Sequence, residues 1–280
     1  MTGSLLSRVL LTIELLATST EGMALHEVAH GLDMPKSAAH RLLAELVERG
    51  YVHHDAVGIY RPTTKVLQLS HAWLAARSVP ETLQPALDRL ARSAGDLVGF
   101  AAVDGDRLAW IATAQGARFG LKVDPEPQME VVLYCSPAGH AWLACHADDE
   151  AIRLVMSQGF GRLPDHGPNA PRTVDAFREQ LTATRSRGYA WGNDSSAAGI
   201  ACVAAAVHHP VNGRVLGVLS ITGPSVRLNE ARSAELSPTL LGTAADIGAL
   251  SADAPMLRPD AQVLAPRSAR VEAAADNARA

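Results

Sequence analysis

Four polar residues open a stretch with helical periodicity, and together they have the chemistry needed to bind DNA. Lys36 and Arg41 can contact a phosphate or a guanine edge. Ser37 can donate to a phosphate oxygen, and His40 can contact either a phosphate or a base. The apolar residues of this stretch fall on the other side of the helix, so the four side chains share an exposed face. The segment therefore predicts a helix that lies in the major groove.

A β-hairpin is expected directly after this helix. Residues 51–54 and 59–61 have the composition of strands, and residues 55–58 that of the turn between them. The hairpin would carry polar side chains to the DNA backbone or the minor groove, namely His53, His54, Tyr60 and Arg61.

The elements that must position these residues can be predicted from the same region. Apolar residues recur at helical spacing over residues 5–17, and a short helix is expected over residues 25–30. Gly31 is expected to close that helix in a left-handed conformation. Pro35 suits the first position of the third helix, which Gly50 ends. The order is helix, helix-turn-helix and hairpin, as in a winged helix-turn-helix.

The charge of this region is balanced, so its arrangement matters more than its sum. Residues 1–77 contain seven Lys and Arg against seven Asp and Glu, and the whole chain has a net charge of −4. Phosphate contacts supply much of the affinity of DNA-binding proteins. A neutral domain can bind DNA only if its cations are segregated on one face.

Three later segments are candidates for a ligand pocket. Residues 134–141 form a loop that opens a helix, whose free N–H groups suit an anion such as a carboxylate. Residues 191–202 and 219–224 are the others, and in the latter Ser220 and Thr222 share one face of a strand. Each segment alone is more typical of ordinary packing.

The chain length and the composition favour two domains and a location in a reducing cytoplasm. A chain of 280 residues suits about two domains, and no apolar run is long enough for a membrane span or arranged as a secretory signal. Its three cysteines do not form a disulfide framework.

The second half of the chain is predicted to be α+β, with helices mixed around an antiparallel sheet. Further helices are expected over residues 63–76 and 81–94, with the domain boundary near residues 78–80. The expected strands cover residues 97–103, 107–114, 119–123, 189–191, 200–207 and 214–222, and the expected helices residues 136–146, 151–156, 173–187 and 230–250. From residue 251 onward the apolar residues do not recur with the period of a helix or a strand, and disorder is expected there.

Some residues of the second half could also belong to a zinc site or to a hydrolase. A zinc site would draw on residues in or beside the pocket segments, which are Cys135, His140, Cys145, His146 and Cys202. Their spacing has no paired metal-ligand motif, and buried cysteines usually pack as small apolar residues. A hydrolase would use Cys202 or Ser136 as its nucleophile, but the chain has neither a nucleophile-elbow motif nor a phosphate-binding glycine loop. No catalytic residue, metal or cofactor is therefore expected.

Residues 4–70 resemble the N-terminal domain of the IclR family of bacterial transcriptional regulators. The resemblance lies in the recognition-helix segment Met34–Leu43 and the strand entry Gly50–Val52, and it continues to about Leu250. It implies a winged helix-turn-helix over residues 1–62, a linker helix over 63–78, a GAF-like effector-binding domain over 79–250 and a tail over 251–280. Members control metabolic operons through operator DNA and a small-molecule effector, as homodimers or dimers of dimers.

The resemblance also implies which residues line the effector pocket. These are Pro137, Ala138, Cys202, Ser220 and Thr222, with Gly192 or Asn193 on the adjoining loop.

The chain departs from the family pattern in several places. Ala38 replaces a common threonine near the DNA, and Ala24 replaces a common helix cap. His140 replaces a frequent lysine, while Gly192 and Ser195 replace an aspartate and a glutamate. A less acidic pocket fits an anionic or neutral effector, and a small organic acid is expected.

Overall fold

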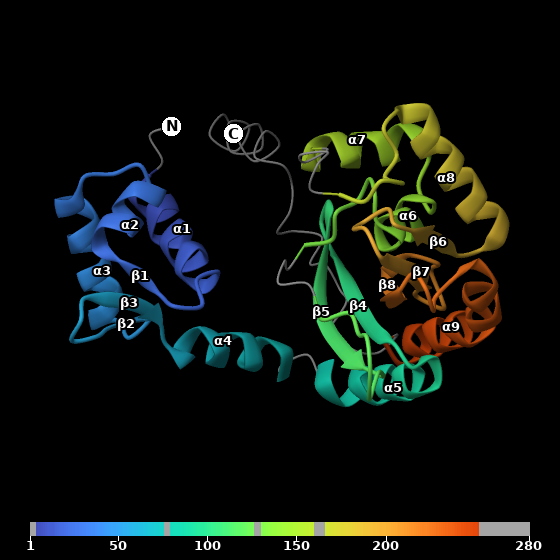
Figure 1. Cartoon of the computed structure of the whole chain (residues 1–280), viewed down its shortest axis with the longest axis horizontal. Helices are drawn as coiled ribbons and strands as arrows, with labels where there is room; N and C mark the ends of the chain where they lie inside the picture. Colours follow the sequence, from blue (N-terminus) through green and yellow to red (C-terminus); the bar gives the residue numbers. More distant parts are fainter. Residues whose placement is uncertain (1–3, 76–78, 126–129, 160–165, 252–280) are drawn as a thin grey trace, which may run out of the picture. The chain divides into compact units, whose positions relative to one another are not determined.

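The computed structural model describes residues 4–75, 79–125, 130–159 and 166–251. The chain divides into two compact units, Met1–Ala76 and Arg77–Ala280. Both units are shown in Figure 1. Most of the residues expected to be disordered, those after Ser251, lie outside the described residues, as do the last residues of the predicted linker.

The first unit is a helical bundle with a small sheet. Its elements in chain order are α1 (Leu5–Ala17), β1 (Met23–Ala24), α2 (Leu25–Gly31), α3 (Lys36–Glu48), β2 (Val52–His54), β3 (Ile59–Pro62) and α4 (Thr64–Ala75). The antiparallel sheet has the order β1-β3-β2, and its first strand was not predicted. Buried Leu16, Val28, Leu43 and Val52 join α1, α2, α3 and β2 in one core.

The turn between α2 and α3 differs from the prediction. Gly31 is the last residue of α2 and has no positive φ, whereas Asp33 takes the left-handed conformation at φ 47°. Asp tolerates that conformation better than most residues. Gly31 has another reason to lack a side chain, because a Cβ there would lie 2.9 Å from Cδ2 of Leu15. The glycine therefore permits α1 and α2 to pack closely.

The missing side-chain cap at Ala24 is partly replaced. Glu27, in the first turn of α2, accepts a hydrogen bond from the backbone N–H of Ala24 at 2.7 Å. A glutamate at this position is one half of a capping box. It also places negative charge near the positive end of the helix dipole.

The second unit is an antiparallel sheet covered by helices. Its elements are α5 (Val79–Ala94), β4 (Leu97–Asp104), β5 (Arg107–Gln115), α6 (Pro137–Leu143), α7 (Asp148–Gln158), α8 (Val174–Arg187), β6 (Ala190–Asn193), β7 (Ile200–His208), β8 (Val215–Pro224) and α9 (Glu230–Ser251). The strand order is β5-β4-β8-β7-β6.

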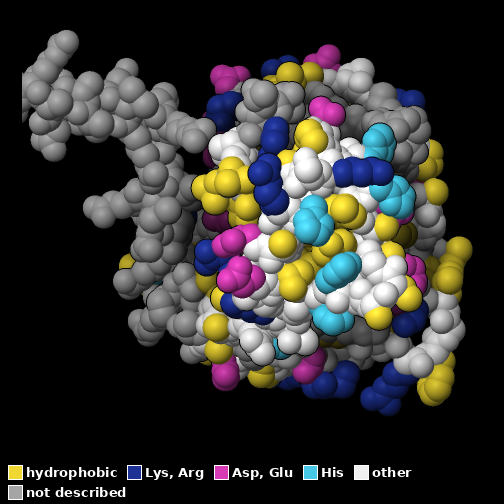
Figure 2. All heavy atoms as spheres, turned by 90° about the vertical axis from the view of Figure 1, so that its left-hand side faces the viewer, with side chains coloured by type: hydrophobic (Ala, Val, Ile, Leu, Met, Phe, Trp, Pro, Cys, Tyr) yellow, Lys and Arg dark blue, Asp and Glu magenta, His cyan; other side chains and the backbone are white. Residues whose placement is uncertain are grey.

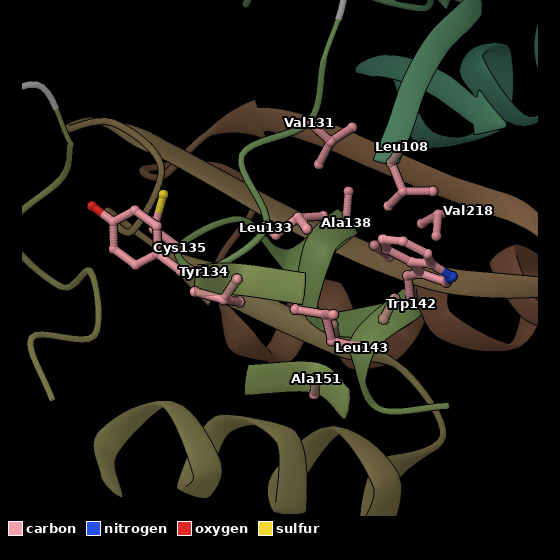
Figure 3. Close-up of a cluster of buried hydrophobic side chains, with 14 of the residues drawn as sticks. Leu108, Val131, Leu133, Tyr134, Cys135, Ala138, Trp142, Leu143, Ala151 and Val218 are labelled. Atoms are coloured by element: carbon pink, nitrogen blue, oxygen red, sulfur yellow. The ribbon is translucent and has the colours of Figure 1, made fainter. Parts of the chain in front are cut away.

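The two faces of this sheet carry different helices. α5 and α9 contact each other and pack along one side, while α6, α7 and α8 lie on the other (Figure 1). A core cluster joins α6 to the sheet through Ala138, Trp142, Ala204 and Val218. Figure 3 shows Trp142 and Ala138 beside Leu108 and Val218 in that cluster.

The strand predicted over residues 119–123 is wrong. Residues 116–125 form bends and irregular backbone, and Phe119 is 91% exposed and Leu121 64% exposed. The alternation of apolar residues there does not reflect a buried face. The ends of the other predicted strands and helices mostly fall close to those in the structure.

Candidate nucleic-acid interface and ligand cavity

The start of α3 presents the predicted cluster of polar side chains to solvent. Lys36, Ser37, His40 and Arg41 are exposed, while Ala39, Leu42, Leu43 and Leu46 of the same helix are buried. Helical periodicity produces this division, since the buried residues recur three or four positions apart. Figure 2 shows histidine, lysine and arginine side chains on a face of the first unit.

The cations at the start of α3 are available for a partner. Within the residues that the structure describes, neither Lys36 nor Arg41 forms an ion pair. The far end of the helix differs, because Arg49 Nε lies 2.6 Å from Glu45 Oε1. The segregation that a neutral DNA-binding domain requires is therefore present along α3 itself.

The wing between β2 and β3 is held by Asp55. Its carboxylate accepts hydrogen bonds from the backbone N–H groups of Val57, at 3.1 Å, and Ile59, at 2.8 Å, and it pairs with the guanidinium of Arg61. The pKa of Asp55 is lowered, chiefly by the hydrogen bond from Ile59 and next by that from Arg61. Arg61 thus stabilises the turn, in addition to any contact with DNA.

Tyr60 does not lie where the sequence analysis placed it. Its side chain is only 4% exposed and belongs to the core of the first unit. Its ring stacks on that of His54, with centroids 4.1 Å apart and an angle of 8° between the planes. His53 and His54 are exposed, so the wing offers imidazoles rather than a phenol to a partner.

A cavity of about 220 Å³ lies in the second unit between α6 and the sheet. Four of the predicted effector residues line it, namely Pro137, Ala138, Cys202 and Thr222. Cys202 and Thr222 are directly opposite each other in the β7–β8 pairing. Three segments far apart in the sequence therefore meet at one cavity.

Several residues that line this cavity were missed as effector contacts. Trp110 comes from β5, and His166 from the loop before α8, where His166 Nδ1 lies 3.6 Å from Cys135 Sγ. Ser196 adds a hydroxyl from the turn after β6. For Trp110 one signal was available in the sequence. Trp110 falls on the predicted strand 107–114, next to the predicted strand 97–103, and so large a side chain there covers part of the sheet.

The remaining predicted effector residues lie elsewhere. Ser220 lines a smaller cavity of about 70 Å³ beside Trp110 and Thr222, and its hydroxyl lies 3.5 Å from the carbonyl oxygen of Gly99. Gly192 and Asn193 line a third cavity. The structure therefore does not bring all seven predicted residues together at one site.

The start of α6 offers little to an anion, contrary to the expectation. Pro137 has no N–H group, and the N–H of Gly139 donates to Ser136 Oγ at 3.0 Å. The N–H of His140 donates to the carbonyl oxygen of Ser136 at 2.9 Å. The N–H groups that a carboxylate would need are therefore largely used within the chain.

The cavity near Cys202 is weakly polar. No Lys, Arg, Asp or Glu is among its lining residues in the described part of the chain. Its polar side chains include the hydroxyls of Ser136, Ser196 and Thr222, the thiols of Cys135 and Cys202, the imidazole of His166 and the indole of Trp110. Apolar walls with a few polar groups are typical of small-molecule sites.

The alternative metal site gains no support. Across the described residues, no three His, Cys, Asp or Glu side chains are grouped so that they could hold a metal ion. His140 is buried and its Nε2 lies 2.7 Å from the Tyr134 carbonyl oxygen, while Cys145 and His146 line another cavity. None of the helices within the described ranges is long and apolar enough to cross a membrane.

Comparison with known proteins gives matches along nearly the whole chain. A family model for the C-terminal domain of the bacterial transcriptional regulator IclR matches residues 71–249, and one for the IclR helix-turn-helix domain matches residues 5–56. The chain is 26% identical over 243 residues to the HTH-type transcriptional regulator BhcR of Paracoccus denitrificans, covering 86% of this chain and 85% of BhcR. It is 25% identical over 251 residues to the transcriptional repressor IclR of Escherichia coli K12, covering 86% and 88% respectively.

Solved structures share the fold. The IclR of Thermotoga maritima superimposes with a TM-score of 0.69 at 22% identity, covering 88% of this chain and 98% of that one. An IclR homologue of Microbacterium hydrocarbonoxydans, solved with 4-hydroxybenzoate, gives a TM-score of 0.71 at 19% identity and the same coverage.

Proposed function

The chain belongs to the IclR family of bacterial transcriptional regulators, and we propose that it binds operator DNA under the control of a small organic acid in the cavity near Cys202. The observation that carries this proposal is the cluster of exposed residues at the start of α3, whose two cations have no acidic partner in the described chain. Regulation of a metabolic operon, in the cytoplasm where the DNA lies, is the corresponding role.

In this proposal α3 enters the major groove. Lys36 and Arg41 contact phosphates or guanine edges, and Ser37 and His40 add further hydrogen bonds. The wing places His53, His54 and Arg61 against the DNA backbone. Phosphate contacts fix the register of the helix, and the base contacts select the sequence.

A homodimer would read two half-sites of a pseudo-palindrome. The support is a set of exposed apolar side chains on two helices of the first unit. Leu6 and Leu10 of α1 are 69% and 54% exposed, and Leu67 of α4 is 54% exposed. Apolar residues gathered on exposed helix faces are typical of subunit contacts.

The effector would be a small, mainly apolar acid. The cavity of about 220 Å³ has walls formed by Trp110, Val131 and Ala138, and hydroxyls at Thr222 and Ser196. His166 is the lining residue whose imidazole can offer a ring N–H to a carboxylate. An aromatic acid fits these walls, and 4-hydroxybenzoate in the Microbacterium hydrocarbonoxydans homologue is the corresponding precedent.

The acid can change the affinity for DNA only if it binds the DNA-competent and the incompetent arrangements unequally. By linkage, operator DNA must then change the affinity for the acid by the same factor. This reciprocity gives a check that does not depend on knowing the arrangements.

The test is a fluorescence-anisotropy titration of the full-length protein against the intergenic DNA beside its own gene, with random DNA as the competitor. Lys36→Ala and Arg41→Ala should each weaken operator binding about tenfold or more, because a bidentate base contact contributes roughly 1–3 kcal/mol. Arg49→Ala is the matched control, since Arg49 is exposed at the C-terminal cap of α3 but paired with Glu45. Unchanged operator binding in both test variants contradicts the assignment of α3.

A further inference from the structure

Two neighbouring cavities of the second unit share a wall. The larger one, of about 220 Å³, is the cavity near Cys202, and the smaller one, of about 70 Å³, is lined by Leu97 and Val123 among others. Within the described residues, Trp110 and Thr222 are the two that line both cavities. These two side chains therefore separate one space from the other.

The indole of Trp110 lies against a glycine of β4. Trp110 pairs with Ala101 across the β4–β5 ladder, and Gly99 precedes Ala101 by two residues, so all three belong to the same face of the sheet. A Cβ at Gly99 would lie 2.7 Å from Cζ3 and 3.2 Å from Cε3 of Trp110. A side chain at position 99 would therefore collide with the ring. The glycine leaves the place on the sheet from which the indole separates the two cavities.

Both residues of the shared wall have surface that a ligand can reach. Trp110 and Thr222 are half-buried, whereas Ser220 beside them is only 1% exposed. Trp110 packs on the core cluster from β5, which is an edge strand of the five-stranded sheet. A change in the size of this side chain therefore changes the space on both sides of it.

The smaller cavity suits an apolar group. Leu97 and Val123 form part of its walls. The backbone at Val123 is held in place, because its carbonyl oxygen accepts a hydrogen bond from Gln115 Nε2 at 2.9 Å. Asp124 also lines this cavity, and its carboxylate lies 3.1 Å from Lys122 Nζ. An acid that reached both cavities would therefore place its alkyl or aryl part here and its carboxylate in the larger one.

We propose that Trp110 is a specificity-determining residue, which limits the effector to an acid short enough for the cavity near Cys202. The volume of that cavity, about 220 Å³, lies below the roughly 300–1,000 Å³ of sites for drug-sized ligands. When a small side chain replaces the indole, the two cavities join, and an apolar extension of the acid lies against Leu97 and Val123. This inference rests on the proposed role of the cavity near Cys202 as an acid-binding site.

The experiment is calorimetric titration of the full-length protein with two series of acids of increasing length. One series runs from acetate to decanoate, and the other from benzoate to 5-phenylpentanoate. In the natural chain the affinity should rise about fourfold with each buried CH₂ group and fall once the larger cavity is full. In Trp110→Ala the longest acid that binds should be about three carbons longer, because the indole is larger than three methylenes. An unchanged limit, or no binding of any acid to either protein at millimolar concentration, overturns the proposal.

Further variants locate the extension of the acid. In the Trp110→Ala background, Val123→Phe refills the smaller cavity and should restore the natural limit on length. A limit that stays long would place the extension elsewhere and refute the joined site. Ile111→Ala is the matched control, because Ile111 is half-buried on the same strand and is not among the described residues that line either cavity. Circular dichroism checks that each variant is folded, and Trp110→Leu, with an intermediate limit expected, replaces Trp110→Ala if the latter does not fold.

The DNA titration separates this inference from the proposed function. If acids release operator DNA from the natural chain and from Trp110→Ala with the same limit on length, the effector role is supported and the role of Trp110 is overturned. If the limit lengthens in Trp110→Ala but no acid changes operator binding, the role of Trp110 is supported and the control of DNA binding is contradicted. The two proposals therefore fail separately.

Discussion

Asp96 and Arg227 form an ion pair that joins the start of β4 to the turn after β8, with 2.5 Å between Asp96 Oδ1 and Arg227 Nη2. The carboxylate is 3% exposed and the arginine side chain 41% exposed. Arg227 also donates to the carbonyl oxygen of Leu121 at 3.3 Å. The hydrogen bond to Asp96 raises the pKa of Arg227, so the guanidinium stays charged. This pair holds the irregular segment 116–125 against the sheet.

Arg227→Met should therefore lower the free energy of unfolding by about 3 kcal/mol, because it leaves a carboxylate buried without its counter-charge. Urea denaturation followed by circular dichroism measures the change. Arg232→Met is the control, since Arg232 pairs with Glu235 at an exposed site and should cost under about 1 kcal/mol. Equal effects of the two substitutions would show that the burial of Asp96 does not matter.

His140 should make stability depend on pH in a specific direction. Burial lowers its pKa from 6.5 to about 4, with a smaller opposing effect from the hydrogen bond to Tyr134. Between these values the unfolded chain binds a proton that the folded chain does not. The free energy of unfolding therefore falls as the pH drops through this range and levels off below about 4. The full effect of this histidine is about 3 kcal/mol.

The variant His140→Gln isolates this contribution, since glutamine can still donate to Tyr134 but does not titrate. Urea denaturation at pH 7 and pH 5 should show a smaller loss of stability for His140→Gln than for the natural chain. Other ionisable groups contribute equally to both proteins. Parallel losses in the two would mean that folding does not change the pKa of His140.

The sequence predicts elements well where burial repeats along the chain. α8 and β8 end within two residues of the predicted positions, because their apolar residues face one core. Residues 119–123 have a similar alternation, but Phe119 is exposed. Periodicity shows which residues are apolar and not what covers them. The covering elements come from distant parts of the chain, so this error could not be avoided from the segment alone.

Tyr60 is a different kind of error, because the information was present. Side chains alternate between the two faces of a strand, so Tyr60 and Arg61 cannot both point outward from the same face. Val52 is buried and His53 exposed in the facing strand. Reading the hairpin with a period of two would have placed Tyr60 in the core.

Strand alternation alone does not explain why the predicted effector residues separate, because Gly192 and Asn193 line the same cavity although the two positions belong to opposite faces. Gly192 pairs with Cys202, so the side chain of Asn193 points to the face of the sheet opposite to that of Cys202. The first part of the segment 191–202, from Trp191 to Ser195, lines the cavity beside α8, and its last part, from Ser196 to Cys202, lines the cavity near Cys202. Which helix covers each face depends on tertiary packing, and local spacing does not contain that information.

Thr222→Val should reduce the response to the effector without reducing DNA affinity. The substitution keeps the shape of the side chain and removes one hydroxyl from the cavity near Cys202. The acid concentration that releases half of the operator should rise about fivefold to tenfold, as expected for one lost hydrogen bond. Anisotropy titrations with and without the acid measure both quantities. A shift in operator affinity without acid would instead indicate a structural role for the hydroxyl.

Gly192 should not tolerate even one added carbon. A Cβ there would lie 2.7 Å from Ser195 Oγ and 2.9 Å from Pro137 Cγ. Ser195 is buried, and Pro137 begins α6, so neither can move freely. Gly192→Ala should therefore lower the free energy of unfolding by about 1–3 kcal/mol, as overpacked cores generally do. Urea denaturation of the purified variant provides the number.

The contact with Ser195 makes this prediction specific. If the crowding is real, Ser195→Gly should remove one of the two clashes, and the double variant Gly192→Ala/Ser195→Gly should lose less stability than the sum of the single variants. Gly188→Ala is unsuitable as a control because Gly188 has a φ of 77°, whereas Gly242→Ala is suitable because nothing lies near its Cβ position. Additive losses at 192 and 195 would mean that β6 moves away from α6 and accommodates the methyl group.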